Sequence, residues 1–180
     1  MGTRKWMAAA AISAASVLAA SSADAQTASP VIWTGLVNVT TTGPNNNGLQ
    51  KTGGFDQNAD AGAYSQQSIT SGDGYLEFTA ANGTTDATIG FTTGSGAGTD
   101  YDFPWAIHLS TVGIAEIREN GGYVAEWTYA TGDTFRIAIA SGVVTYTHNG
   151  GAPHTSAVSP TYPVKVDSSI SPRTSRSSFG

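Results

Sequence analysis

The chain has 180 residues, a net charge of −5 and only 12% charged residues, against about 25% in an average soluble domain. It contains no cysteine, which excludes disulfide bonds, thiolate metal sites and cysteine nucleophiles. An acidic and weakly charged surface repels phosphate backbones, so we expect no nucleic-acid partner.

Residues 1–25 carry the three parts of a secretory signal peptide. Arg4 and Lys5 give a positive start, residues 6–20 are small and apolar, and Ala23-Asp24-Ala25 is a small-x-small cleavage sequence. The apolar run is shorter than the roughly 20 residues that a membrane-spanning helix needs, and serines interrupt it. We therefore predict cleavage after Ala25, a mature chain without a membrane span, and a secreted location, either extracellular or periplasmic.

The rest of the chain suits one domain over residues 26–170, since about 100–200 residues per domain is typical. Apolar residues alternate with polar ones from residue 74 onward, where Leu76 and Phe78 lie on one face and Tyr75 and Glu77 on the other. This alternation indicates strands with one face on a core. The same pattern covers residues 105–109, 123–129, 133–140 and 143–148.

Glycine-containing pairs separate these runs. Asn120-Gly121, Ser141-Gly142 and Asn149-Gly150 supply the positive φ angles that tight hairpin turns need. Three longer stretches, residues 43–48, 53–62 and 92–102, are polar or glycine-rich and read as loops. Residues 171–180 have no periodicity, so we predict a flexible tail. No helical stripe follows residue 25, and roughly ten or eleven short strands predict an all-β sandwich or barrel.

The order of several motifs resembles concanavalin A-like (SPRY- and laminin-G-like) jelly-roll modules of secreted bacterial proteins. The most specific part is Gly132-Asp133-Thr134-Phe135-Arg136-Ile137, followed by a strand that ends in an Asn-Gly turn. The resemblance covers roughly residues 31–169. The supporting motifs are the segments 49–54, 63–69, 71–78, 129–137, 143–150 and 161–164.

The resemblance implies a two-sheet antiparallel β-sandwich of the jelly-roll type. Modules of this kind usually bind carbohydrate or protein surfaces. Two departures weaken the transfer of a ligand site. Residues 55–61 lack the tryptophan expected near there, and His148 stands where a second aromatic residue or a lysine is common. A fold does not by itself give a function.

Some enzymes of related fold cut glucans, which needs two carboxylates across the scissile bond, about 5 Å apart in retaining enzymes. The Glu-x-Asp-x-x-Glu strand motif of laminarinase-type enzymes is absent. Asp73 lies in a turn, so it makes no pair with Glu77, and Glu116 and Glu119 are three apart and face opposite sides of a strand. No histidine pair has zinc-ligand spacing, and no Gly-x-Ser-x-Gly supports a serine triad.

Aromatic side chains are the usual platform for sugars. Trp33 and Trp105 alternate in step with aliphatic residues and are predicted in the core. The candidate ligand-binding residues are therefore Tyr101, His108, Tyr123, Trp127 and Tyr129. The face with Tyr123, Trp127 and Tyr129 is either part of the core or a concave aromatic surface, and His108 either lines such a surface or faces solvent.

Alternate acids in polar loops suit calcium, which takes oxygen ligands. Asp100 and Asp102 are the weak candidates for a metal site, with Asp56, Asn58 and Asp60 in a second loop. Short polar residues are also ordinary in turns, and neither run matches the helix-loop-helix calcium motif.

The sequence favours a secreted non-catalytic binding module, with a glycan or other cell-surface polymer as the partner. The first alternative is a structural or adhesive surface protein whose sheets mediate assembly. The second is a glycoside hydrolase with an atypical site.

Overall fold

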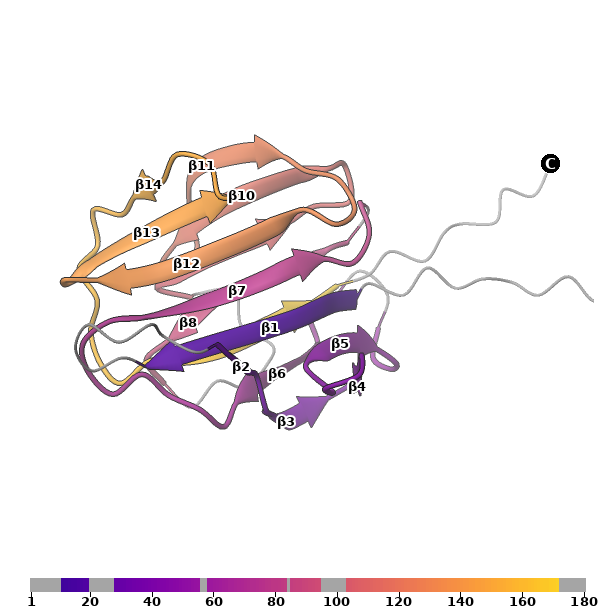
Figure 1. Ribbon diagram of the computed structural model, residues 1–180. Coiled ribbons are helices and arrows are strands. Elements are labelled where there is room, and N and C mark those ends of the chain that lie inside the picture. The colour runs from indigo at the N-terminus through magenta and orange to yellow at the C-terminus, as the bar shows by residue number, and fades with distance from the viewer. Residues whose placement is uncertain (1–10, 20–27, 56–57, 84, 95–102, 172–180) are drawn as a thin grey trace, which may run out of the picture.

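A computed structural model describes residues 11–19, 28–55, 58–83, 85–94 and 103–171, and for residues 11–19 the backbone alone. These residues form two antiparallel sheets that pack face to face (Figure 1). The predicted two-sheet β-sandwich is therefore confirmed. No helix occurs among the described residues, and so none there is long and apolar enough to span a membrane.

Sheet A has eight strands in the order β14-β13-β12-β7-β1-β5-β4, with β2 paired to β1. Its strands are β1 (Ala11–Ala19), β2 (Ser29–Pro30), β4 (Val39–Thr42), β5 (Gly48–Lys51), β7 (Gly74–Ala80), β12 (Thr134–Ala140), β13 (Val143–His148) and β14 (His154–Thr155).

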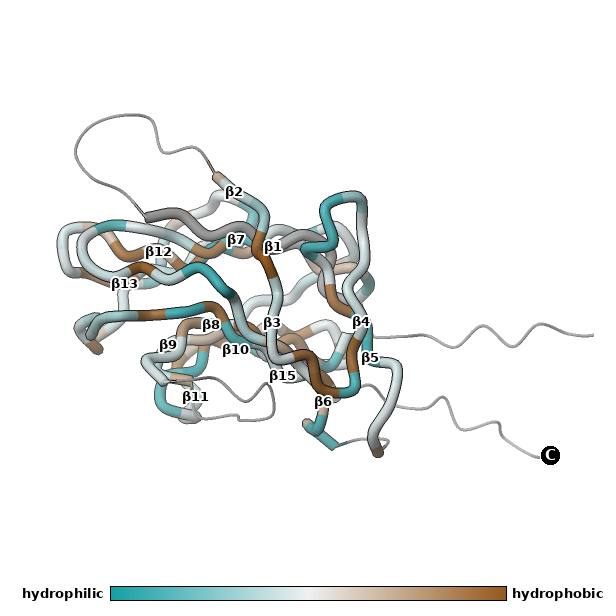
Figure 2. The backbone as a smooth tube through the Cα atoms, turned by 90° about the horizontal axis from the view of Figure 1, so that it is seen from below, coloured by the Kyte–Doolittle hydropathy of each residue, from teal (hydrophilic) through white to brown (hydrophobic). Residues whose placement is uncertain are grey.

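Sheet B has seven strands in the order β11-β10-β9-β8-β15-β6-β3. Its strands are β3 (Trp33–Val37), β6 (Ala61–Ser65), β8 (Ala87–Thr92), β9 (Trp105–Leu109), β10 (Ile114–Glu119), β11 (Gly122–Thr128) and β15 (Lys165–Ile170). Seen along the sandwich, the two sheets form separate layers (Figure 2).

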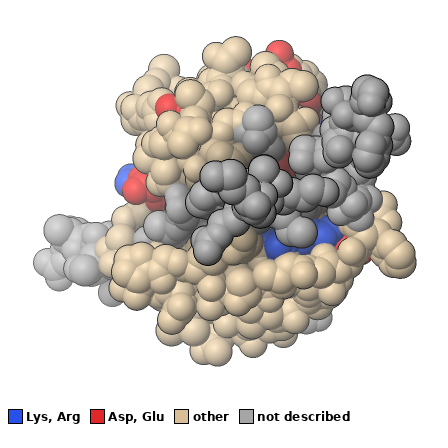
Figure 3. Space-filling view, turned by 90° about the vertical axis from the view of Figure 1, so that its right-hand side faces the viewer, with Lys and Arg blue, Asp and Glu red and all other residues tan. Residues whose placement is uncertain are grey.

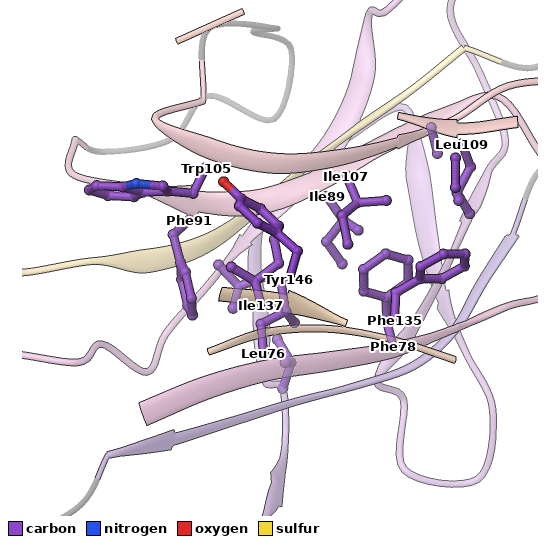
Figure 4. Close-up of a cluster of buried hydrophobic side chains, with 14 of the residues drawn as sticks. Leu76, Phe78, Ile89, Phe91, Trp105, Ile107, Leu109, Phe135, Ile137 and Tyr146 are labelled. Carbon is purple, nitrogen blue, oxygen red and sulfur yellow. The ribbon is translucent and has the colours of Figure 1, made fainter. Parts of the chain in front are cut away.

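The core fills the space between the layers. Leu76 and Phe78 of sheet A face Ile107 and Leu109 of sheet B across it, and all four are at most 1% exposed (Figure 4). The alternation predicted along β7 and β9 is thus confirmed, because every second residue of these strands is in the core cluster. Trp33 and Trp105 are buried as predicted.

The predicted turns adopt the expected conformation. Asn120-Gly121 and Ser141-Gly142 have positive φ at both residues, 49° and 77° in the first and 51° and 76° in the second. Each pair joins two neighbouring antiparallel strands, β10 to β11 and β12 to β13. Such turns match the right-handed twist of the strands they connect.

Two observations differ from the predicted domain limits. Ala11–Ala19, inside the predicted signal peptide, is strand β1 in the middle of sheet A. Ser171, placed in the predicted tail, is 4% exposed, and its N–H donates to the Asp86 carbonyl at 2.9 Å. Cleavage after Ala25 stays a prediction.

Candidate functional site

The five predicted ligand residues do not share one surface. Tyr101 lies outside the described residues. Tyr129 is buried, and its hydroxyl donates to the Ser110 carbonyl at 2.9 Å. Burial raises the pKa of this phenol to about 12. Trp127 packs against the core, with its ring centroid 5.7 Å from that of His148.

Tyr123 lies on the opposite side of β11 from Trp127. The register shifts between Ile117 and Arg118 of β10, so that Ile117 pairs with Ala125 while Arg118 pairs with Tyr123. This β-bulge turns Tyr123 to the outer face, where it is 58% exposed. The interpretation that Tyr123, Trp127 and Tyr129 share a face is therefore wrong at Tyr123.

His108 is half-buried on the outer face of sheet B. Its Nδ1 lies 3.0 Å from the Thr88 hydroxyl oxygen. The pKa of its imidazole is lowered mainly by desolvation and, to a smaller extent, by the positive charge of Arg118. The structure separates His108 from Trp127 and Tyr129, which contribute to the core.

The metal candidates lie in two separate loops. Asp100 and Asp102 lie outside the described residues, so calcium at these positions stays a prediction. In the other loop, the Lys51 ammonium occupies the position expected for a cation. It donates to the Phe55 and Asn58 carbonyls, each at 2.9 Å, and to Asp60 Oδ1 at 2.5 Å. Lys51 thus contacts the described oxygens of this loop, while Asp56 lies outside the described residues. No cluster of three or more His, Cys, Asp or Glu that could hold a metal occurs in the described parts of the chain.

A groove of about 460 Å³ opens elsewhere, on the outer face of sheet A. Strands β7, β12 and β13 supply its floor, and the chain after β13 supplies a wall. The polar and wall residues that line it are Glu77, Thr134, Arg136, Thr145, Thr147 and Pro153. Sequence reasoning missed this groove.

The groove centres on an ion pair across two strands. Arg136 is the register partner of Glu77, and its Nε and Nη2 donate to Glu77 Oε2 at 2.8 and 2.6 Å. The guanidinium carbon also lies 4.2 Å from the ring centroid of Tyr75, a cation–π distance. Both charged side chains remain more than 40% exposed, so they are held in place and still reach solvent.

The hydroxyls beside this pair come from the same strand alternation. Thr147 is the register partner of Arg136, and Thr145 is the partner of Ala138. Residues directly opposite in antiparallel strands share a face, so the threonines line one side of the charged pair. The surface therefore offers hydroxyls, one carboxylate and one guanidinium within a net-neutral groove.

One other face of the molecule carries few charged side chains. On the face drawn in Figure 3, Lys, Arg, Asp and Glu side chains occupy small separate areas, and most of the described surface is uncharged. On this face, a ligand of high charge would meet little that complements it.

No protein-family model matches the sequence, and no curated protein matches it. Among solved structures, the chain is similar to the TRIM65 PSpry domain at 16% identity with a TM-score of 0.49, over 62% of this chain and 66% of that one. It is also similar to the SPRY domain of human HERC1 at 11% identity with a TM-score of 0.26, over 63% of this chain and 82% of that one.

The fold itself is a two-sheet antiparallel β-sandwich. Both of these similar structures are SPRY domains, the kind of module that the sequence motifs resemble. The chain spans just under two thirds of the TRIM65 domain that it matches, and a likeness of this degree carries no information about the ligand. An origin among secreted bacterial proteins stays a prediction.

Proposed function

We propose that this protein is a non-catalytic binding module that takes a neutral carbohydrate in the groove on the outer face of sheet A. The observation that supports this is the Arg136–Glu77 pair set among threonine hydroxyls. Both side chains line the groove and are more than 40% exposed, so the pair offers a guanidinium donor and a carboxylate acceptor to a ligand. Neighbouring sugar hydroxyls, which donate and accept together, match such a set.

The engaged carboxylates support a binding role over hydrolysis. Glu77 is paired with Arg136, and Glu116 is paired with Arg118 at 2.6 Å. Glu119 Oε1 accepts a hydrogen bond from the Tyr146 hydroxyl at 3.1 Å, and it lies on the side of β10 opposite to Glu116. A glycosidase needs one carboxyl to give a proton and another to attack or activate water.

Export is part of the proposal. The signal-like residues 1–25 support a secreted protein, extracellular or periplasmic, in which the groove meets polymers of a cell surface or matrix. The mass of the protein recovered from the medium or periplasm tests this, because cleavage after Ala25 leaves a chain that begins at Gln26.

A glycan array with the purified protein, with and without added calcium, tests the ligand class. Arg136→Ala should weaken binding to any glycan found by at least about tenfold, since one charge-assisted contact is worth about 1.5–3 kcal/mol. Arg118→Ala is the matched control, because Arg118 makes a similar ion pair on the outer face of sheet B. An array without binders, or equal loss in both variants, would contradict the proposal.

A second candidate is an adhesive or assembly protein. Exposed apolar side chains occur on both edge strands of sheet B, with Leu36 and Val37 on β3 and Val124 on β11 at the opposite edge. Exposed apolar edges favour pairing between chains. Light scattering across a dilution series tests this, and Leu36→Lys should abolish any association found while Val112→Lys, at an exposed turn, should not.

A further inference from the structure

Strand β1 holds the two parts of sheet A together. It pairs with β7 at seven positions, from Ile12 opposite Ala80 to Ala19 opposite Gly74. On its other side it pairs with β5 at two positions and with β2 at two more. Figure 1 shows it running the length of the sheet beside β7.

The same residues lie inside the predicted signal peptide. If the chain is exported and cut after Ala25, as proposed above, the strand leaves with the signal. Sheet A then separates into β14-β13-β12-β7 and the two-strand unit β5-β4, and β2 loses the partner that the structure gives it. An isolated two-stranded unit is at best marginally stable in water.

Removal also exposes a long edge. The edge of β7 over Gly74–Ala80 would carry unpaired backbone groups along its whole length. Beneath it lie Leu76 and Phe78, which are at most 1% exposed in the complete sheet. A long apolar edge of this kind is a template for an added strand.

The new N-terminal end cannot restore the missing pairing. β1 is antiparallel to β7 and also antiparallel to β2, so β2 runs parallel to β7. Moved one position across, Ser29–Pro30 would meet β7 in the wrong direction. Proline also lacks the N–H that a central strand donates.

We propose that loss of residues 1–25 turns sheet A into a strand acceptor, and that the vacant position between β7 and β5 takes an extended, uncharged segment of another chain, antiparallel to β7. The chemistry of the occupant follows from β1 itself. Residues 11–19 are only Ala, Ser, Ile, Val and Leu, and their register partners on β7 alternate between buried Leu76, Phe78 and Ala80 and half-buried Tyr75, Glu77 and Thr79.

The test uses the full chain, expressed without export, with a sequence-specific protease site in place of residues 20–25. After folding, the chain is cut, and a fluorescent peptide of residues 9–20 is added in excess. We expect the cut segment to stay bound through gel filtration and to exchange for the labelled peptide, with the anisotropy rising to saturation. Aggregation after release of the segment, prevented by the peptide, would also support the proposal.

Two single-lysine peptides are matched controls. Val17→Lys places a charge opposite Leu76, which is fully buried, and should weaken binding by at least about tenfold. Ser16→Lys places the same charge opposite Glu77 and should change binding by no more than about threefold. Equal affinity of the two peptides would overturn the proposed register.

Three other outcomes overturn the proposal: a cut chain that releases the segment and stays folded and monomeric without binding peptide, aggregation that the peptide does not prevent, and binding of a scrambled peptide with equal affinity. The proposal rests on the proposed export, yet the two can fail separately. An exported protein that retains residue 1 contradicts cleavage, whereas the cut-chain experiment tests the acceptor without any export.

Discussion

The outer faces of the two sheets carry similar ion pairs in different surroundings. Arg136 and Glu77 of sheet A lie opposite each other on β12 and β7, and both are more than 40% exposed beside a groove. Arg118 and Glu116 of sheet B lie two apart on β10, 33% and 22% exposed, and Arg118 also donates to the Gly121 carbonyl at 3.1 Å. The first pair is available to a ligand, while the second is tied to its own hairpin.

The outer face at the centre of sheet B is buried. Thr88 and Ser169 are register partners on the face away from the core, and each is 1% exposed. Gly90 and Asp167 are partners one step further along, and Asp167 is 2% exposed. Similar strand chemistry thus gives an open outer face on sheet A and a buried one at the centre of sheet B.

The largest effect should come from adding one methyl group to the closed face. A Cβ at Gly90 would lie 2.1 Å from the Trp105 carbonyl oxygen and 2.7 Å from Ala106 Cα, so the β8–β9 pairing must shift. Gly90→Ala should lower the free energy of unfolding by about 3 kcal/mol, measured by urea denaturation.

Gly83→Ala is the control, because its nearest atoms would be 3.8 Å away. If Gly90→Ala costs no more than Gly83→Ala, the tight packing of β8 on β9 is contradicted.

A smaller effect is expected at the turn that joins the two sheets, between β11 and β12. Asp133 accepts hydrogen bonds from Asn149 Nδ2 at 2.9 Å and the Ala130 N–H at 3.0 Å, and lies 2.8 Å from His148 Nε2. Asp133→Ala should cost about 1–2 kcal/mol of stability at neutral pH, since these bonds hold the ends of three chain segments.

The pH dependence gives this prediction a second readout. The hydrogen bonds from Asn149 and Ala130 and the contact with His148 lower the pKa of Asp133 to about 2, from 3.8 in the unfolded chain. The unfolded state therefore binds the proton first, and the contribution present above about pH 4 is lost as the pH falls towards 2. Asp133→Asn should flatten that part of the stability curve, and an unchanged curve would contradict the assignment.

The strands were predictable because alternation is a local pattern. The side-chain arrangement on the sheet faces was not predictable, because it depends on which strands become neighbours. The alternation over Gly74–Ala80 involves only neighbouring residues and predicted strand β7. The Ser141-Gly142 pair is equally local and predicted the β12–β13 hairpin. The Arg136–Glu77 pair joins residues 59 apart, and only strand order brings them together. The bulge that turns Tyr123 outward has no sequence signal that alternation can detect.

Residues 11–19 have a local sequence pattern that fits two different structures. Their small and apolar composition is typical of a signal peptide, and it also suits a strand over a buried layer. Composition alone does not distinguish the two.

His108 gives a weaker, pH-dependent contrast between the faces. Burial and the nearby Arg118 lower the pKa of its imidazole below 6.5. Because the unfolded state takes up the proton first, stability should decrease as the pH falls below about 6.5. Denaturation at about pH 7.5 and about pH 5.5 should show this loss, and His108→Asn should reduce it; a loss that His108→Asn leaves intact would assign it to other groups.

The smallest stability effect should come from the two arginines themselves. Partly exposed ion pairs contribute about 0–1 kcal/mol, so Arg136→Ala and Arg118→Ala should each leave the free energy of unfolding within about 1 kcal/mol of the parent. Loss of glycan binding in Arg136→Ala with an unchanged unfolding curve would then report the groove and not the fold. A large destabilisation by Arg136→Ala would instead mean that its stacking on Tyr75 supports sheet A, and the outer face of sheet A would be a structural surface like the centre of sheet B.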